Sequence, residues 1–198
     1  MNKNDLRYVK TEANLKQAFL ALLATEDCSG ITVSQLCQQA QCARNTFYQH
    51  YDSLEALRTG VIAQILTGIG AAFRPTGETL AEIKGDQVRL YVQHIITAVD
   101  TQRAALTILL AKDDGAFQKQ LVDVIVQQVL AGDRGLSQVA DTAVNRLNVA
   151  YMAWAVAGFV ARWLNEPSIT PEQACDLFFQ LHQPTISTNV AYLATAPR

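Results

Sequence analysis

The chain has 198 residues, of which 49% are hydrophobic and 17% are charged, and its formal net charge is −2. This apolar content, with so small a net charge, excludes an intrinsically disordered chain and allows a substantial buried core. The length suits one ordinary domain, or a small domain fused to a larger one. A net charge near zero gives no overall basic character, so a DNA-binding surface would depend on where individual charges lie.

The sequence pattern is helical throughout. Proline and glycine are few and no run alternates strictly between apolar and polar residues, which predicts an all-α protein of about nine helices. Residues 1–6 predict a short disordered arm. A first helix is predicted over Tyr8–Thr25, because apolar residues recur there at helical spacing, namely Leu15, Ala18, Phe19, Leu22 and Leu23. Gly30 then favours a turn before Ile31.

The next stretch of the chain carries the most informative local pattern. Thr32 and Gln35 stand three apart, the spacing of a capping box, which predicts a helix over Val33–Gln39. A second short helix is predicted over Arg44–His50, with Phe47 turned inward and polar side chains turned outward. Two short helices joined by a tight turn form the helix-turn-helix pattern.

A longer helix is predicted after this pattern. It begins after Asp52 or Ser53, either of which can cap it, and runs to about Phe73. The Pro and Gly within residues 74–77 then mark a boundary. Apolar periodicity predicts further helices over Leu80–Asp100, Arg103–Ala111, Phe117–Ala131 and Val139–Asn165, and a last helix from Thr170 that stops at Pro184.

The last two predicted helices have distinctive signals. Leu147–Ala161 carries no charge, and a helix that is apolar on all sides must be buried on all sides, by its own core and by a second subunit. Gly158 would permit close approach of another helix. The final helix begins with Thr170 as N-cap, Pro171 in its first turn and Gln173 completing a capping box.

The helix-turn-helix segment resembles that of the tetracycline-repressor (TetR) family of bacterial transcriptional regulators. The likeness rests on the string TVSQLCQQAQCARNTFYQHYDSLEAL, in which Thr-Phe-Tyr-x-His-Tyr-Asp is closest to a branch that includes regulators of dihydroxyacetone-kinase operons. The resemblance implies a three-helix DNA-binding domain over residues 1–58 and a helical effector-binding and dimerisation domain over residues 59–198. It also implies a homodimer joined through the last two helices, a palindromic operator in double-stranded DNA, a small-molecule effector and a repressor role.

The resemblance further implies which side chains would meet DNA. They are Thr32, Arg44, Asn45, Thr46, Tyr48, Gln49 and His50 in the motif, with Lys3 and Arg7 from the amino-terminal end. Arg44 is the leading candidate for a base or phosphate contact, because a guanidinium binds guanine or phosphate through two hydrogen bonds. Asn45 either pairs with adenine or only caps the helix. Gln49 and His50 lie at the far edge, where they contact DNA or nothing.

The second part of the chain offers candidates for an effector pocket. They are the amphipathic or aromatic residues Tyr91, His94, Phe117, Tyr151 and Trp154. Each has the alternative role of packing in the helical core, and His94 also that of an exposed helix residue. No cluster of charges indicates the chemical class of the ligand.

No pattern indicates catalysis, a cofactor or a metal. The sequence lacks a GxSxG elbow, an HExxH motif, a P-loop and a GxGxxG loop after a strand, so we expect neither an enzyme nor a cofactor. The four cysteines lack zinc-ligand spacing and are expected to be buried, with a thiol switch between Cys37 and Cys42 as the alternative. No secretory signal is evident, and the longest apolar run falls short of the ~20 residues of a membrane span. These features predict a cytoplasmic protein with no membrane partner.

A hypothesis from another functional class stays open, that of a TetR-fold co-regulator that acts through protein contact without reading DNA. Leu54 stands where the family has a phosphate-binding Lys, Ala43 where it has a capping Ser or Asn, and Gln41 where it often has Gly. A missing cap weakens a helix by ~1 kcal/mol. In addition, basic and acidic residues are equal in number over residues 1–58. A plain ligand-binding helical module is a third, more remote hypothesis.

Overall fold

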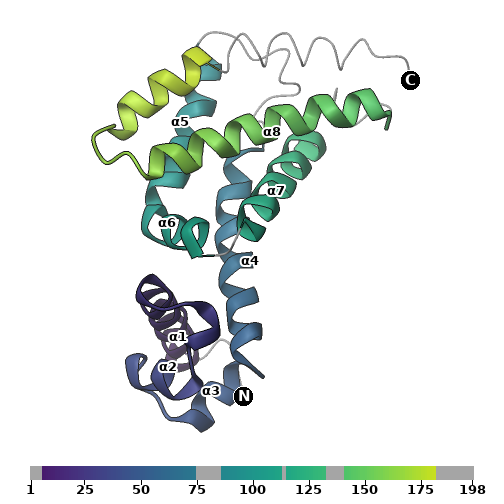
Figure 1. Cartoon of the computed structure of the whole chain (residues 1–198). Helices are drawn as coiled ribbons and strands as arrows, with labels where there is room; N and C mark the ends of the chain where they lie inside the picture. Colours follow the sequence, from purple (N-terminus) through teal and green to yellow (C-terminus); the bar gives the residue numbers. More distant parts are fainter. Residues whose placement is uncertain (1–5, 75–85, 113–114, 133–140, 182–198) are drawn as a thin grey trace.

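The computed structural model describes residues 6–74, 86–112, 115–132 and 141–181, and every regular element within these ranges is a helix (Figure 1). The α-helices are α1 (Leu6–Thr25), α2 (Val33–Gln39), α3 (Arg44–His50), α4 (Leu54–Ala72), α5 (Asp86–Thr101), α6 (Arg103–Lys112), α7 (Ala116–Gly132) and α8 (Ala143–Leu164). A short 3-10 helix, Cys28–Gly30, follows α1, and residues 171–181 form one more helix. The predicted all-α fold is confirmed.

Local capping signals fix the helix starts. The helices α2 and α3 have the predicted bounds, and α4 begins after Ser53, whose hydroxyl oxygen accepts a hydrogen bond from the Ala56 N–H at 3.0 Å. Ser53 rather than Asp52 is therefore the N-cap of α4. The helix α1 begins at Leu6, two residues before the predicted start. The predicted start of the following body helix, Leu80, lies outside the described residues.

The last two helices also begin at threonine caps. The prediction that α8 starts at Val139 is wrong, because Thr142 is its N-cap and accepts a hydrogen bond from the Asn145 N–H at 3.2 Å. The capping box before residues 171–181 is confirmed, since Thr170 and Gln173 exchange two hydrogen bonds of 2.9 and 3.2 Å. The predicted stop at Pro184 lies outside the described residues.

The chain is arranged as a head and a body connected by α4 (Figure 1). The helices α1, α2 and α3 form the head, and α4 runs from it along its whole length into the body, where it packs against α5 and α7. One continuous core runs through both parts. Its fully buried members include Leu15, Phe19, Leu36, Phe47 and Leu57 near the head and Ile69, Ile95, Leu106, Phe117 and Phe178 in the body. The head also meets the body directly, because α1 contacts α6 and Lys112 Nζ lies 3.3 Å from Asp27 Oδ1.

One face of α8 is exposed in the single chain, and the other face packs in the core, so the predicted burial by a second subunit stays a prediction. The exposed large apolar residues at this end of the molecule are Val144, Leu147, Tyr151 and Trp154 on α8 and Leu177 and Leu181 on the last helix, and we call them the α8 stripe. Leu147 is 73% exposed and Tyr151 is 64% exposed. Exposed apolar residues that gather on one face mark a surface that meets a partner.

The helix α8 is also the element to compare with a membrane span. It is the one helix among the described residues that is long and apolar enough to cross a bilayer, where the sequence pattern had indicated a run too short for that. Its most apolar window is 28% buried. Core helices of soluble proteins reach the same length and hydropathy, so this single helix is weak evidence for a span.

Candidate nucleic-acid interface

The start of the helix-turn-helix is fixed by a confirmed capping box. The Gln35 side-chain oxygen accepts from the Thr32 N–H at 2.9 Å, and the Thr32 hydroxyl oxygen accepts from the Gln35 N–H at 3.2 Å. The Gln35 amide nitrogen also donates to the Glu26 carboxylate at 3.2 Å. These bonds satisfy amides that α2 leaves unpaired at its amino end, so the helix begins at a defined residue. Thr32 itself stays exposed.

The turn between α2 and α3 is closed by a left-handed residue. Gln41 has φ 54°, and its N–H donates to the Gln38 carbonyl at 3.2 Å. The next residue, Cys42, donates its N–H to the Cys37 carbonyl at 3.0 Å. This pair of bonds is the Schellman ending of a helix, whose left-handed position usually holds Gly. The turn therefore forms although the glycine usual at this position is absent.

The helix α3 presents one polar face to solvent. Phe47 is completely buried and anchors the helix, while Arg44, Asn45, Tyr48 and Gln49 are exposed. We call these four residues the reading face. Thr46 is half-buried beside them. In Figure 1, α3 lies at the end of the head away from the body, where a long ligand such as DNA has access.

The surroundings of the reading face show one available positive charge, no side-chain cap for α3 and no basic side chain at position 54. Arg44 has no ion-pair partner within the part of the chain that the structure describes, so its guanidinium is available to a ligand. Ala43 provides no side-chain cap for α3. Leu54 is half-buried against the core, which leaves its position without a phosphate contact.

Three other residues predicted to meet DNA differ from the reading face. The His50 ring stacks on Tyr8 of α1, with ring centroids 3.8 Å apart, and its Nδ1 is enclosed without a hydrogen-bond partner among the described residues. Burial lowers the pKa of His50, and the Glu12 carboxylate opposes this shift less strongly. His50 thus packs α3 against α1. Arg7 is exposed near the start of α1, and Lys3 lies outside the described residues.

Behind the reading face, a polar relay joins three helices, and we call it the Glu12 relay. The Tyr51 hydroxyl donates to Glu12 Oε1 at 3.2 Å, and Lys16 Nζ lies 2.7 Å from the same oxygen. Lys16 Nζ also donates to Gln64 Oε1 on α4 at 2.7 Å. The hydrogen bond from Lys16 is the main reason that the pKa of Glu12 lies below its usual value.

Sequence reasoning did not find the Glu12 relay. Glu12 and Lys16 stand four apart on α1, which is a recognisable spacing for an ion pair on a helix. Tyr51 and Gln64 are distant in sequence from this pair, and no local pattern indicates that they join it. The pKa of Tyr51 is raised well above its usual value, by burial first and by Glu12 second.

The cysteines of the motif are placed as packing residues. Cys37 is buried, and Cys42 packs against the same core. Burial, together with the neighbouring Cys37, raises the pKa of Cys42 to about 11. A thiol with such a pKa stays protonated near neutral pH and reacts slowly, which favours packing over a thiol switch. No cluster of possible metal ligands occurs among the described residues.

The five residues predicted to line an effector pocket are not brought together. Tyr91 is buried and donates its hydroxyl to the Phe73 carbonyl at 2.7 Å, and Phe117 is buried in the core. In contrast, His94 is exposed on α5, and Tyr151 and Trp154 belong to the α8 stripe. None of the five lines a described cavity.

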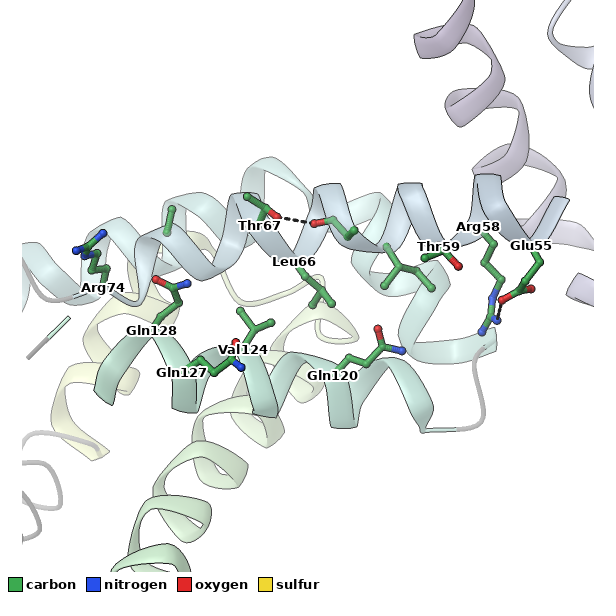
Figure 2. A pocket seen from close by; sticks show the side chains of 13 residues that line it. Glu55, Arg58, Thr59, Leu66, Thr67, Arg74, Gln120, Val124, Gln127 and Gln128 are labelled. Atoms are coloured by element: carbon green, nitrogen blue, oxygen red, sulfur yellow. Dashed lines mark hydrogen bonds and ion pairs between the residues drawn. The ribbon is translucent and has the colours of Figure 1, made fainter. Parts of the chain in front are cut away.

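A groove with a volume of about 640 Å³ lies instead between α4 and α7 (Figure 2). Its polar lining comes from Glu55, Arg58, Thr59, Thr67, Arg74, Gln120, Gln127 and Gln128, and its apolar lining from Ile62, Ala63, Leu66, Ala71 and Val124. The three glutamines stand seven and one apart on α7, a helical spacing that the sequence could have indicated as one polar face.

Comparisons with known proteins agree with this architecture. No family model matches the chain. An uncharacterised HTH-type transcriptional regulator of Bacillus subtilis, YxbF, is 25% identical over 164 residues, which is 82% of this chain and 42% of that protein. The chain thus spans less than half the length of this curated relative. A TetR transcriptional regulator from Streptococcus agalactiae superposes with a TM-score of 0.61 at 21% identity, covering 89% of this chain and 96% of that structure.

A third comparison concerns the predicted branch of the family. The dihydroxyacetone kinase operon activator DhaS superposes with a TM-score of 0.58 over 92% of this chain and 97% of that structure, at 13% identity. At this identity the likeness shows a shared fold and does not single out the branch. The comparisons together show that the chain has the fold of TetR-type regulators.

Proposed function

We propose that this chain, with its TetR-type fold, is a DNA-binding transcriptional regulator that places α3 in the major groove. The observation that carries the proposal is the reading face, in which Arg44, Asn45, Tyr48 and Gln49 project from a short helix anchored by Phe47. Arg and Asn are the side chains that pair with guanine and adenine edges, and tyrosine hydroxyls and amides bind phosphate. The helix-turn-helix homologue from Bacillus subtilis supports the same function.

The α8 stripe supports a homodimer. Its six exposed apolar side chains lie on the last two described helices, the elements that we expect to pair across a two-fold axis. Packing them against a second copy would remove them from water, which is the main driving force of association. A two-fold dimer presents two copies of α3 to one side of a duplex and reads a palindromic site.

The groove between α4 and α7 supports a response to a small molecule. Because α4 extends from the head into the body, a ligand that separates α4 from α7 would tilt the head and change the spacing of two reading faces. The glutamine amides and the Arg74 guanidinium of the groove suit a polar ligand with hydrogen-bond acceptors. A ligand bound there should raise the melting temperature of the wild type but not of Gln128→Leu, and release DNA. A repressor role fits such release.

The test of DNA binding is the substitution Arg44→Ala. It should lower affinity for an operator at least tenfold, since the proposed dimer would lose two bidentate arginine contacts worth about 1–3 kcal/mol each, and leave thermal unfolding unchanged. Fluorescence anisotropy of labelled DNA, selected from a random library by the wild-type protein, measures the affinity. Lys119→Ala is the matched control, because it removes one exposed charge from α7 in the body. Equal affinities for the wild type and Arg44→Ala would contradict the proposal that α3 binds DNA through its reading face.

The alternative is a co-regulator that acts through protein contact, and two observations favour it. Ala43 provides no cap for α3, and half-buried Leu54 provides no phosphate contact. DNA titrations at several salt concentrations separate the two functions. The affinity of a DNA-binding protein falls steeply as salt is raised, because the release of counterions from DNA becomes less favourable. If the protein selects no DNA sequence from the library, and its weak DNA affinity does not change with salt concentration, the co-regulator function is supported.

A further inference from the structure

The Glu12 relay lies where the reading helix, the helix behind it and the helix that leads into the body meet. Tyr51 is the residue directly after α3, Glu12 and Lys16 belong to α1, and Gln64 belongs to α4. The Tyr51 ring also lies against α4, since a Cβ placed on Gly60 would be 3.5 Å from its Cε1 atom. The end of α3 is thus held from two sides.

Both connections pass through one oxygen atom. Glu12 Oε1 accepts from the Tyr51 hydroxyl and from Lys16 Nζ, and the same ammonium group reaches the Gln64 side chain. The side chains of Lys16 and Glu12 are 23% and 33% exposed, so water competes less for the bond between them than for the bond from Lys16 to the exposed Gln64. Hydrogen bonds to charged groups are stronger than neutral ones, and they strengthen one another in a chain.

The stack of Tyr8 on His50 reinforces the same joint. Tyr8 stands one helical turn before Glu12 on α1, and His50 directly precedes Tyr51. Two neighbouring contacts, one aromatic and one ionic, therefore fix the carboxyl end of α3 against α1. The ionic contact continues through Lys16 to Gln64 on α4, whereas the stack of Tyr8 on His50 ends on α1. One hydrogen-bonded path from α4 to the end of α3 thus passes through Glu12.

We propose that Glu12 is the positioning residue of the reading helix and that its carboxylate couples the orientation of α3 to that of α4. This inference rests on the proposed function, because a fixed orientation of α3 matters for reading DNA. Glu12 acts through Tyr51 and Lys16 and does not itself contact DNA. When α4 tilts, Lys16 and Glu12 carry the displacement to Tyr51, so the reading face turns with α4.

The first test replaces Glu12 and measures affinity for the selected operator. Glu12→Ala should lower affinity about tenfold, and Glu12→Gln should recover most of it, because its amide oxygen accepts from the same two donors. Asp123→Ala is the matched control, since it breaks a comparable four-apart pair with Lys119 on α7 in the body. An affinity of Glu12→Ala within twofold of the wild type would overturn the proposal.

The second test measures coupling between the two ends of the relay. Tyr51→Phe and Gln64→Met each remove one end without touching the other, and their effects on operator affinity should combine non-additively by at least threefold. The same pair in a Glu12→Ala background should be additive, because the connection is gone. Additivity in the wild-type background would contradict coupling through Glu12, and a merely structural role would give no such difference.

The third test needs no DNA and separates this inference from the proposed function. Hydrogen exchange of the amides of α3 should become about tenfold faster in Glu12→Ala, while amides of α5–α8 keep their wild-type rates. Unchanged exchange in α3 would contradict the positioning role. If the wild type selects no DNA sequence, the proposed function fails, and the exchange result still decides whether Glu12 holds α3.

Discussion

Gln41 occupies a backbone conformation that suits glycine. Its φ of 54° places it in the left-handed region at the Schellman turn between α2 and α3. A residue with a Cβ is strained there by roughly 1–2 kcal/mol, because the side chain crowds its own carbonyl. The turn still forms because Phe47 and Leu36, on the two helices that it joins, are fully buried. The energy of this burial exceeds the local strain.

Gln41→Gly should therefore stabilise the protein. Relief of the left-handed strain is offset by the roughly 0.4–1 kcal/mol that extra freedom gives to the unfolded chain, so we expect a gain of about 0.5–1 kcal/mol. Urea denaturation followed by circular dichroism measures it. Gln39→Gly is the control, because Gln39 is exposed and helical and its change should destabilise by up to about 1 kcal/mol. A loss of stability in Gln41→Gly would contradict the strain.

His50 makes the stability of the head depend on pH. Its folded-state pKa is lowered by burial, so the neutral ring is favoured in the fold while the unfolded chain takes up a proton near its ordinary pKa. Stability is then greatest above that ordinary value and falls as pH drops through the folded pKa. The groups that face the ring are Tyr8 and Glu12 of α1 and Tyr51 next to it.

Melting temperatures between about pH 7.5 and 5.5 test this dependence. The wild type should lose stability toward the acid end, and His50→Gln should show a shallower loss because the titrating group is gone. His94→Gln provides the control, since His94 is exposed on α5. If the melting temperatures of the wild type and His50→Gln fall in parallel with pH, the pKa of His50 does not differ between the folded and the unfolded chain.

At the scale of helices, Gly70 sets how closely α7 approaches α4. A Cβ at this position would lie 2.6 Å from Val124 Cγ1 and 3.4 Å from Gln128 Cγ. The first distance is shorter than real Cβ contacts, so the Val124 side chain or the two helices would have to shift. Val124 and Gln128 also line the groove of Figure 2, and the approach at Gly70 therefore determines its width.

Gly70→Ala should destabilise the protein by about 1–3 kcal/mol, as expected for an overpacked core, despite the better helix propensity of alanine. The double substitution Gly70→Ala with Val124→Ala removes the clashing methyl group and should recover part of this loss beyond additivity. Thermal and urea unfolding of the two single variants and the double variant give the comparison. Strict additivity would show that the two helices do not meet at these atoms.

Local sequence signals predicted the features that depend on residues close together in the chain, such as the start of a helix. The capping boxes at Thr32 and Thr170 fixed helix starts because a cap and its partner are three residues apart. The Glu12 relay and the α4–α7 groove join residues distant in sequence, and no local pattern encodes such neighbours. For the same reason the predicted pocket residues proved to be dispersed, since aromatic character alone does not distinguish core Phe117 from exposed Trp154.

At the scale of the whole molecule, the α8 stripe is an apolar surface that the described residues leave exposed. A charge-free stretch in the sequence predicted burial on all sides, and the single chain buries only one side. The described part of α8 packs on α7, and its opposite face carries Leu147 and Tyr151. A Cβ on Gly158 would meet nothing within 4 Å, so this face also offers a flat place for a second helix.

Leu147→Glu should convert the proposed dimer into a monomer and abolish tight operator binding. Two-fold symmetry places the change twice in one interface, and each buried leucine contributes roughly 1.5–3 kcal/mol, so the dimer should weaken at least about a hundredfold. Sedimentation velocity measures the oligomeric state. Val9→Glu changes an apolar residue of α1 that is 52% exposed, and it should leave the dimer intact. Helical content should be unchanged in both variants, because neither side chain is buried within one chain. A Leu147→Glu protein that stays dimeric would place the interface elsewhere, and the spacing of the two copies of α3 would then have to be set by another surface.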